Sequence, residues 1–266
     1  MRCVPAVLWA TSCLLAAQVS AQSYETTAVA EGVYQFRWEG HNAMFVVGVG
    51  EVAFFDPIGV DPARRLAAEL ARVAPGLPIT HLIYSHADAD HATGAHALLE
   101  ASGDPDASIV AHERAVAPII ERADPDQPAP SVTYAQRMTL TGGGREIQLH
   151  YLGSSHTDNL IVPFVPDAGV AFAVDFDSND RMGYQDLPGW IFPDFYGAVS
   201  GLLTLPFETI VFGHGPPGDR GTIHRQIEYY DDLTTAVRDA VQRGWSEDRA
   251  AEEIRLPRYA DWDQYE

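Results

Sequence analysis

Short apolar runs separated by glycine- and proline-containing breaks mark the first half of the chain. Residues 32–38, 43–48 and 52–55 are rich in β-branched and aromatic side chains, and only short polar or glycine-containing stretches separate them. Such runs with turn residues between them predict an antiparallel meander of three strands. The apolar run at 80–85, preceded by two prolines, predicts the next, buried strand.

Helical periodicity follows the meander and returns near the end of the chain. Asp61-Pro62 is typical of a helix start, and Leu66, Leu70 and Val73 share one face of that helix. Residues 223–241 form a second, longer helix with a predicted apolar stripe of Ile227, Tyr230, Leu233, Val237 and Val241. The remaining helices are predicted at 91–101, 113–122, 195–203 and after Ser246, and the remaining strands at 108–111, 132–140, 146–152, 160–165, 170–174 and 209–212.

Two runs of strands, each finished by helices, indicate the fold class. This order favours an α/β (α+β) fold in which two mixed sheets form a sandwich covered by helices on both outer faces. The proline-rich stretch at 124–130 is interpreted as an ordered surface loop rather than a linker. We therefore expect residues 22–266 to form a single domain.

The first 21 residues have the pattern of a secretory signal peptide. Arg2 provides a positive start, residues 4–17 are apolar, and Val19-Ser20-Ala21 offers a small-x-small cleavage site before Gln22. The apolar run is too short and too broken to span a membrane. We therefore expect a periplasmic or secreted protein without a membrane span.

Composition narrows the classes of partner. The formal net charge is −20, and every basic residue except the histidines is Arg, since the chain has no Lys. Such a surface repels nucleic acid and anionic lipid, so the expected partner is a small-molecule substrate. Both cysteines, Cys3 and Cys13, lie in the signal, so the mature protein has neither a disulfide nor a thiolate ligand. The oligomeric state is not specified by the sequence.

The densest chemistry is the heptapeptide Ser85-His86-Ala87-Asp88-Ala89-Asp90-His91, directly after a predicted strand. In extended chain His86 and Asp88 point the same way and can share one metal ion, whereas Asp90 and His91 follow at the turn into a helix and can serve a second. Imidazole and carboxylate at this density are typical of a two-metal hydrolytic centre, although a solvated acidic loop containing two histidines is the plainer alternative.

Three more candidate ligands follow predicted strands. His156 comes just after 146–152, Asp175 directly after 170–174 and His214 shortly after 209–212. Sites of this kind use a sheet as a rigid frame and its loops to aim side chains. A single histidine at a strand end is more often structural, but three such positions after one dense motif favour a shared metal site.

Together these segments resemble a known family. The heptapeptide, the Gly-x-x-His156-Thr157 segment, Asp175 after an apolar strand and Gly213-His214-Gly215 are similar to the signature of the metallo-β-lactamase superfamily, over roughly residues 30 to 245. The resemblance implies an αββα four-layer sandwich with the metal centre at one edge between the sheets. It also implies a first metal held by His86, Asp88 and His156, a second held by Asp90, His91 and His214, and Asp175 bridging both.

One position departs from the family pattern His-x-His-x-Asp-His, because Asp88 replaces the second histidine. A carboxylate there adds negative charge and weakens the first metal as a Lewis acid, although it still binds zinc. Similar sequences occur in phosphodiester-cleaving members, and a related carboxylate occurs in the flavodiiron branch, where the metals are iron. We expect two divalent metal ions, with zinc favoured and iron as the alternative.

The resulting functional hypothesis is an exported binuclear hydrolase. A metal-bridging hydroxide is expected to cleave a small ester, lactone or amide, β-lactams included, with Asp90 binding metal and orienting the nucleophile. Three alternatives stay open: a phosphodiesterase or phosphoesterase of the same fold, an iron-dependent oxidoreductase, and a non-catalytic metal-binding protein.

Candidate substrate contacts surround this centre. By resemblance His41 lies in a loop that borders the active site, and Asn159 is either an oxyanion donor or a turn cap. The aromatic segment 176–197, with Tyr184 and Trp190, is interpreted as a pocket wall or as plain loop packing. Asp56 resembles the family aspartate that braces the metal loop.

Overall fold

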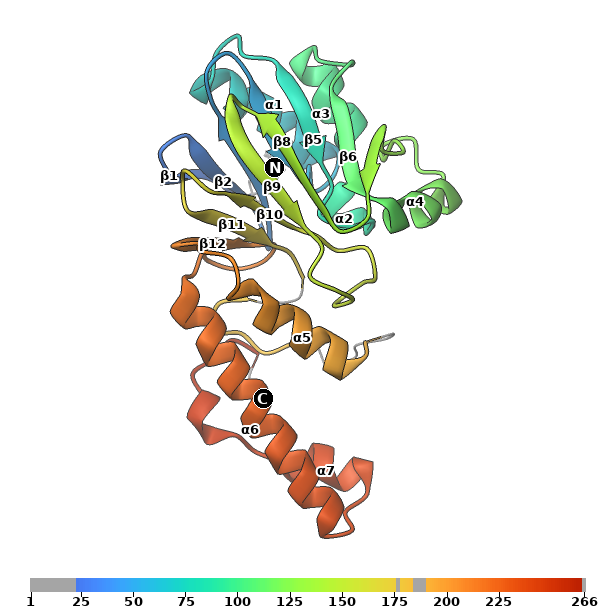
Figure 1. Cartoon of the computed structure of the whole chain (residues 1–266), viewed down its shortest axis with the longest axis vertical. Helices are drawn as coiled ribbons and strands as arrows, with labels where there is room; N and C mark the ends of the chain where they lie inside the picture. The colour runs from blue at the N-terminus through green and yellow to red at the C-terminus, as the bar shows by residue number, and fades with distance from the viewer. Residues whose placement is uncertain (1–22, 176–177, 184–189, 265–266) are drawn as a thin grey trace, which may run out of the picture.

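The computed structural model describes residues 23–175, 178–183 and 190–264, and within them the strands form two sheets packed face to face (Figure 1). The first sheet has the strand order β1 (Tyr24–Ala30), β2 (Val33–Trp38), β3 (His41–Val47), β4 (Val52–Phe55), β5 (Ile79–Ile83), β6 (Ser108–His112) and β7 (Val132–Tyr134). The second has the order β12 (Thr209–Phe212), β11 (Val170–Ala173), β10 (Val162–Val165), β9 (Arg145–His150) and β8 (Arg137–Gly142). Both sheets mix parallel and antiparallel pairs.

Helices cover the two outer faces. The first sheet carries α1 (Val60–Val73), α3 (Ala95–Ser102) and α4 (Val116–Arg122), and the second carries α5 (Phe192–Leu202) and α6 (Arg220–Gln242). The shorter elements are α2 (Ala89–Ala92), α7 (Glu247–Glu253) and the 3-10 turns η1 (Glu113–Ala115) and η2 (Pro257–Tyr259). The predicted αββα sandwich is therefore confirmed.

Strand β4 shows how one strand fills two apolar layers at once. Val52 and Phe54 pack into the layer under α1 and α3, whereas Ala53 and Phe55 point into the layer between the sheets. All four are fully buried because alternate residues of a strand face opposite sides and both sides of this sheet are covered. A third layer lies between the second sheet and α5 and α6.

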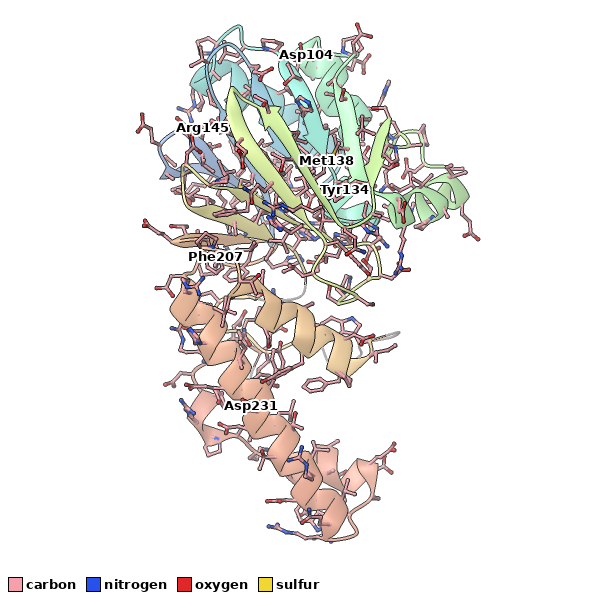
Figure 2. All side chains as sticks on the ribbon, viewed as in Figure 1. Asp104, Tyr134, Met138, Arg145, Phe207 and Asp231 are labelled. Carbon is pink, nitrogen blue, oxygen red and sulfur yellow. The ribbon has the colours of Figure 1, made fainter. Side chains whose placement is uncertain are left out.

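Two segments differ from the sequence prediction. The single strand expected at 132–140 is two strands, β7 and β8, which belong to different sheets. The chain crosses between the sheets at residues 135 and 136, and Tyr134 and Met138 on either side of the crossing pack against the layer between them (Figure 2). Strand β1, which the prediction omitted, is mostly exposed and pairs with β2 at the edge of the first sheet.

The helix expected at 91–101 is interrupted at Gly94. This residue has φ 94°, and a Cβ atom there would lie 2.3 Å from the Gly59 carbonyl oxygen. Its N–H donates to the Asp126 carbonyl 2.8 Å away instead of continuing the helix. The close approach of three segments at this glycine therefore divides the helix into α2 and α3.

The outer half of α6 extends away from the sandwich together with α7 (Figure 1). Val237 is 42% and Val241 69% exposed, so the predicted apolar stripe is wrong for this half of the helix. Ile227 and Tyr230, nearer the start of α6, do pack beneath the second sheet. None of the described helices, α6 included, is both long and apolar enough to cross a membrane.

Candidate metal centre

The predicted ligands meet at one edge of the sandwich because the strands that carry them end there. Ser85 and His86 follow β5, which runs parallel to its neighbours β4 and β6. In the opposing sheet, Asp175 follows β11 and His214 follows β12, and these two strands are also parallel. Parallel strands bring their carboxyl ends to the same edge, which is where the two sheets present these side chains to each other.

The first cluster contains His86, Asp88 and His156, which together could hold a metal ion. Asp88 Oδ2 lies 3.1 Å from His156 Nε2 and 3.6 Å from His86 Nε2. Donors bound tetrahedrally to one zinc ion at about 2.0–2.2 Å lie roughly 3.3–3.6 Å from each other. The 3.6 Å separation is that of co-ligands around one small ion, and the 3.1 Å contact is a hydrogen bond.

The second cluster contains Asp90, His91 and His214, with His41 beside them. Asp175 lies between the two clusters and faces both. Its Oδ2 is 3.3 Å from His86 Nε2, and its Oδ1 is 3.2 Å from His91 Nε2 and 2.9 Å from His214 Nε2. The two oxygens of one carboxylate thus point at different clusters, which is the arrangement of a bridging ligand.

Several donor atoms of these clusters are buried without a hydrogen-bond partner. His86 Nε2, His91 Nε2 and Asp175 Oδ1 are among the buried polar atoms that lack one. Leaving such an atom unpaired costs about 1–3 kcal/mol, so these positions would be unfavourable in a site that stayed empty. The orphaned atoms converge on the two clusters, and the residues present therefore fit a metal ion at each.

Partners on the far side of the rings turn the Nε2 atoms toward the clusters. Ser85 Oγ lies 2.8 Å from His86 Nδ1, and His214 Nδ1 donates to the Gly40 carbonyl oxygen 2.7 Å away. Such partners set the tautomer and orientation of metal-binding histidines. A Cβ at Gly213 would lie 2.6 Å from a methyl carbon of Val174, so the residue before His214 must be glycine for β12 to end this close to β11.

Asp56 braces the metal loop as the sequence predicts. It is fully buried at the end of β4, and its Oδ1 accepts the Ser85 N–H at 2.8 Å. Its Oδ2 faces His91 Nδ1 at 3.9 Å, and neither of these two atoms has a hydrogen-bond partner. Burial raises the pKa of the Asp56 carboxyl, against the opposing effect of the His91 and His86 charges.

The imidazoles and carboxylates of the two clusters shift each other's pKa values. Burial lowers the pKa of His86, but the nearby Asp175 and Asp88 carboxylates outweigh it and raise the pKa to about 10. Burial raises the pKa of Asp175, but the neighbouring imidazoles of His91, His214 and His86 hold it well below its usual range. The His156 hydrogen bond and the nearby His86 lower the pKa of Asp88. The carboxylates therefore attract cations into the centre.

The structure places the predicted substrate contacts in different surroundings. Asn159 is buried; its side-chain oxygen accepts the Ala87 N–H at 2.9 Å, as a turn cap does, and its amide donates to Asp158 Oδ1 at 3.3 Å. The oxyanion-donor role stays a prediction. Trp190 lies beside His156 with ring centroids 5.8 Å apart, and its ring also packs on Phe195. His41 lies against the second cluster, with Nε2 3.3 Å from Asp90 Oδ2. Tyr184 is outside the described residues.

Asn42 is a positioning residue that the sequence analysis did not identify. Its side-chain amide donates to the Phe212 and Gly215 carbonyl oxygens at 2.9 and 2.8 Å, and its own N–H donates to Gly213 at 2.8 Å. These bonds join the start of β3 to the loop that carries His214. A polar residue in a predicted turn gives no sign of partners about 170 positions away.

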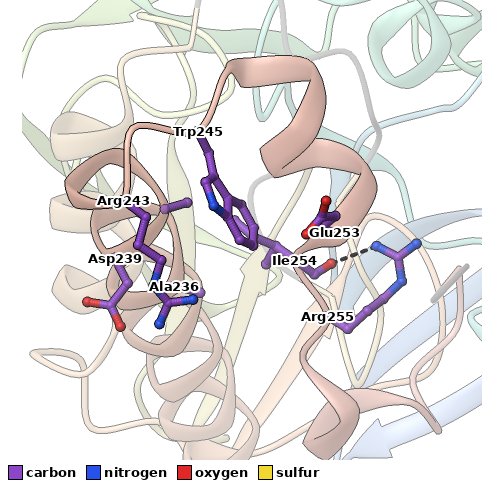
Figure 3. A pocket seen from close by; sticks show the side chains of 8 residues that line it. Ala236, Asp239, Arg243, Trp245, Glu253, Ile254 and Arg255 are labelled. Atoms are coloured by element: carbon purple, nitrogen blue, oxygen red, sulfur yellow. Dashed lines mark hydrogen bonds between the residues drawn. The ribbon is translucent and has the colours of Figure 1, made fainter.

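A separate cavity of about 210 Å³ lies at the end of α6, where Asp239, Arg243 and Trp245 face Glu253 and Arg255 from α7 and the segment after it (Figure 3). None of its lining residues belongs to either cluster. The chemistry of the protein is therefore expected at the open edge of the sandwich and not in this cavity.

Comparisons with known proteins agree with this geometry. The family model described as the metallo-beta-lactamase superfamily matches residues 36–214, which is more than half of the chain. Among the matching solved structures is a metallo-beta-lactamase from Pontibacter korlensis, 19% identical, with a TM-score of 0.66 over 77% of this chain and 98% of that chain. At this identity the likeness shows the fold alone. No curated protein gives a match. On the family model and the fold together, the chain belongs to the metallo-beta-lactamase superfamily.

Proposed function

We propose that this protein is a two-metal hydrolase that cleaves a small ester, lactone or amide, β-lactams included. The observation that carries the proposal is Asp175, whose Oδ2 faces His86 while its Oδ1 faces His91 and His214. One carboxylate between two donor clusters suits a pair of ions a few ångströms apart. We propose zinc at both metal positions, because imidazole and carboxylate donors suit Zn²⁺ and this ion has no redox chemistry that the protein would have to control.

The protein's own side chains have distinct tasks. His86, Asp88 and His156 would hold one ion and Asp90, His91 and His214 the other, with Asp175 shared. When bound, such ions polarise the scissile bond and provide a nucleophile from water at neutral pH. Asp90 has a side chain that is 56% exposed although its neighbour His91 is fully buried. It is thus the carboxylate best placed to accept a proton from the attacking water.

The surroundings favour an uncharged or apolar substrate portion. Trp190 lies beside His156 and packs on Phe195, so an apolar group next to the first cluster would contact an aromatic face. The chain's net charge of −20 disfavours polynucleotides, although a small phosphoester is not excluded by charge. The pattern of residues 1–21 supports export to the periplasm or medium.

The test combines metal loading with a substrate panel. The protein is stripped with a chelator and reloaded with zinc, and bound metal is measured by inductively coupled plasma mass spectrometry. Hydrolysis of p-nitrophenyl acetate, a lactone, a chromogenic cephalosporin and bis-p-nitrophenyl phosphate is then measured. We expect two zinc ions per chain, turnover of at least one carboxylic substrate, and a loss of about 100-fold or more in Asp175→Asn.

Asp167→Asn is the matched control, because Asp167 is an exposed aspartate that pairs with Arg145 away from the clusters. It should keep both metal ions and full activity. Turnover of the phosphodiester alone would assign the protein to the phosphodiesterases of this fold. Iron in place of zinc would indicate redox chemistry, and absence of turnover with both metals bound would favour a metal-binding role.

A further inference from the structure

His41 occupies the first position of β3 and belongs to the second cluster by distance. One donor atom from each of His41, Asp90, His91 and His214 lies within 4.8 Å of all the others. The His41 ring centroid is 4.6 Å from that of His214 and 5.4 Å from that of His91. Its side chain is 33% exposed, between those of Asp90 at 56% and His91 at 0%.

The contact between His41 and Asp90 has the geometry of co-ligands. Their facing atoms are 3.3 Å apart. A charge-assisted N–H to carboxylate bond is usually about 2.7–2.9 Å long, whereas two donors on one zinc ion lie roughly 3.3–3.6 Å apart. The other edges of the cluster range more widely: His91 Nε2 lies 3.7 Å from Asp90 and 3.2 Å from Asp175, and His214 Nε2 lies 2.9 Å from Asp175.

The backbone keeps His41 in this place. The residues on both sides of it are joined to the His214 loop, because Gly40 accepts the His214 Nδ1 hydrogen bond and Asn42 bonds Phe212, Gly213 and Gly215. Asn42 is fully buried. One clamp across the two sheets therefore sets the position of both His41 and His214.

We propose that His41 is an additional protein ligand of the second metal, and that this site consequently binds its ion more tightly and fills first. This inference rests on the proposed two-metal function and extends it. The second cluster then has three imidazoles and Asp90 plus one oxygen of Asp175, whereas the first has two imidazoles and Asp88 plus the other oxygen. A larger donor set, richer in imidazole, favours the second site for divalent transition metals.

Cobalt(II) titration of the metal-free protein tests the order and the ligand together. The wild type should bind two Co²⁺ in resolved steps, and the weak visible absorption of the first step should indicate a high coordination number. In His41→Ala the affinity of that step should fall about 100-fold or more, and its absorption should strengthen as a donor is lost. The nuclear magnetic resonance spectrum of His41→Ala with one bound Co²⁺ should lack one paramagnetically shifted imidazole N–H signal that the wild type shows.

Two further variants distinguish metal binding by His41 from its hydrogen bond to Asp90 and provide a control. His41→Gln preserves a hydrogen bond to Asp90 but not the imidazole ligand, so it should resemble His41→Ala. His150→Ala removes a half-buried histidine of β9 that contacts Gln148, and it should titrate as the wild type does. Unchanged spectra in His41→Ala, even with weaker binding, would overturn the proposal and leave His41 as a hydrogen-bond partner of Asp90. Failure of the wild type to bind two ions would instead overturn the two-metal function.

Discussion

Replacing Asp56 separates the stability of the fold from its capacity to bind metal. Asp56 Oδ1 accepts the buried Ser85 N–H at 2.8 Å, and the residue has φ 54°, where asparagine is tolerated and alanine is strained. Asp56→Ala leaves that N–H unpaired, at about 1–3 kcal/mol, and adds about 1–2 kcal/mol of backbone strain. We expect its free energy of unfolding to fall by about 2–5 kcal/mol.

Asp56→Asn should behave differently. An asparagine oxygen can still accept the Ser85 N–H, so the free energy of unfolding of the metal-free protein should stay within about 1 kcal/mol of the wild type. The negative charge facing His91 Nδ1 is lost, however, and partners of this kind are worth about 10- to 100-fold in metal affinity. The assays are urea unfolding without metal and zinc competition against a chelating dye.

Asp104 provides the control. Its Oδ2 accepts the N–H of Ile79, the first residue of the same strand, β5, that Asp56 braces at its other end (Figure 2). Substituting Asp104 by alanine should lower stability and leave zinc affinity unchanged. The reasoning would be refuted if Asp56→Asn bound zinc as the wild type does, or if it lost as much stability as Asp56→Ala.

Two other predictions test the parts around the centre. Asp219 caps α6 by accepting the Thr222 N–H at 2.9 Å. Asp219→Ala should therefore lower the free energy of unfolding, measured by urea denaturation, by about 1 kcal/mol, whereas Asp219→Asn should leave it nearly unchanged. Trp190→Ala should reduce kcat/KM for an aromatic ester about 3- to 10-fold, mainly through a higher KM, because Trp190 lies beside His156. The kcat/KM for a methyl ester should stay almost unchanged. Equal losses on both esters would argue against contact between Trp190 and the substrate.

Most of the fold could be predicted from the sequence because its strands are buried on both faces. Apolar runs such as that of β4 stand out from the turn residues around them. The misses have physical causes. The mostly exposed β1 carries little apolar signal, and a continuous pattern at 132–140 does not reveal that the chain changes sheets. The interruption at Gly94 depends on Gly59, which is remote in sequence.

The candidate ligands could be predicted for a different reason, since each lies at the end of a recognisable strand. The family resemblance also implies their division into two clusters, which the structure reproduces. The contacts that surround the clusters could not be predicted. The resemblance places His41 in a loop that borders the site, but its contact with His214 depends on the Gly40–Asn42 clamp between the two sheets. The 2.9 Å bond from Ala87 N–H to the Asn159 side-chain oxygen, which supports the predicted turn cap, likewise depends on packing that the sequence does not specify.

Backbone strain concentrates around the centre. Of the seven described residues other than glycine that have positive φ, four lie in loops that form or support it: Glu39, Asp56, Ile58 and Asp175. The other three, Ala123, Asp180 and Gln264, belong to other segments. Ile58 is the costliest, because a β-branched side chain is strained at φ 70°, yet its N–H donates to the His91 carbonyl oxygen at 2.8 Å. Glycine would relieve the strain at Asp56 and Asp175 but would remove the carboxylates. The cost is about 1–3 kcal/mol for a residue such as Ile58 and less for the two aspartates, which tolerate this region, so the total is a sizeable fraction of the net stability of a typical domain. Such strain persists where the surrounding structure enforces it, and metal binding to the folded state would offset part of it.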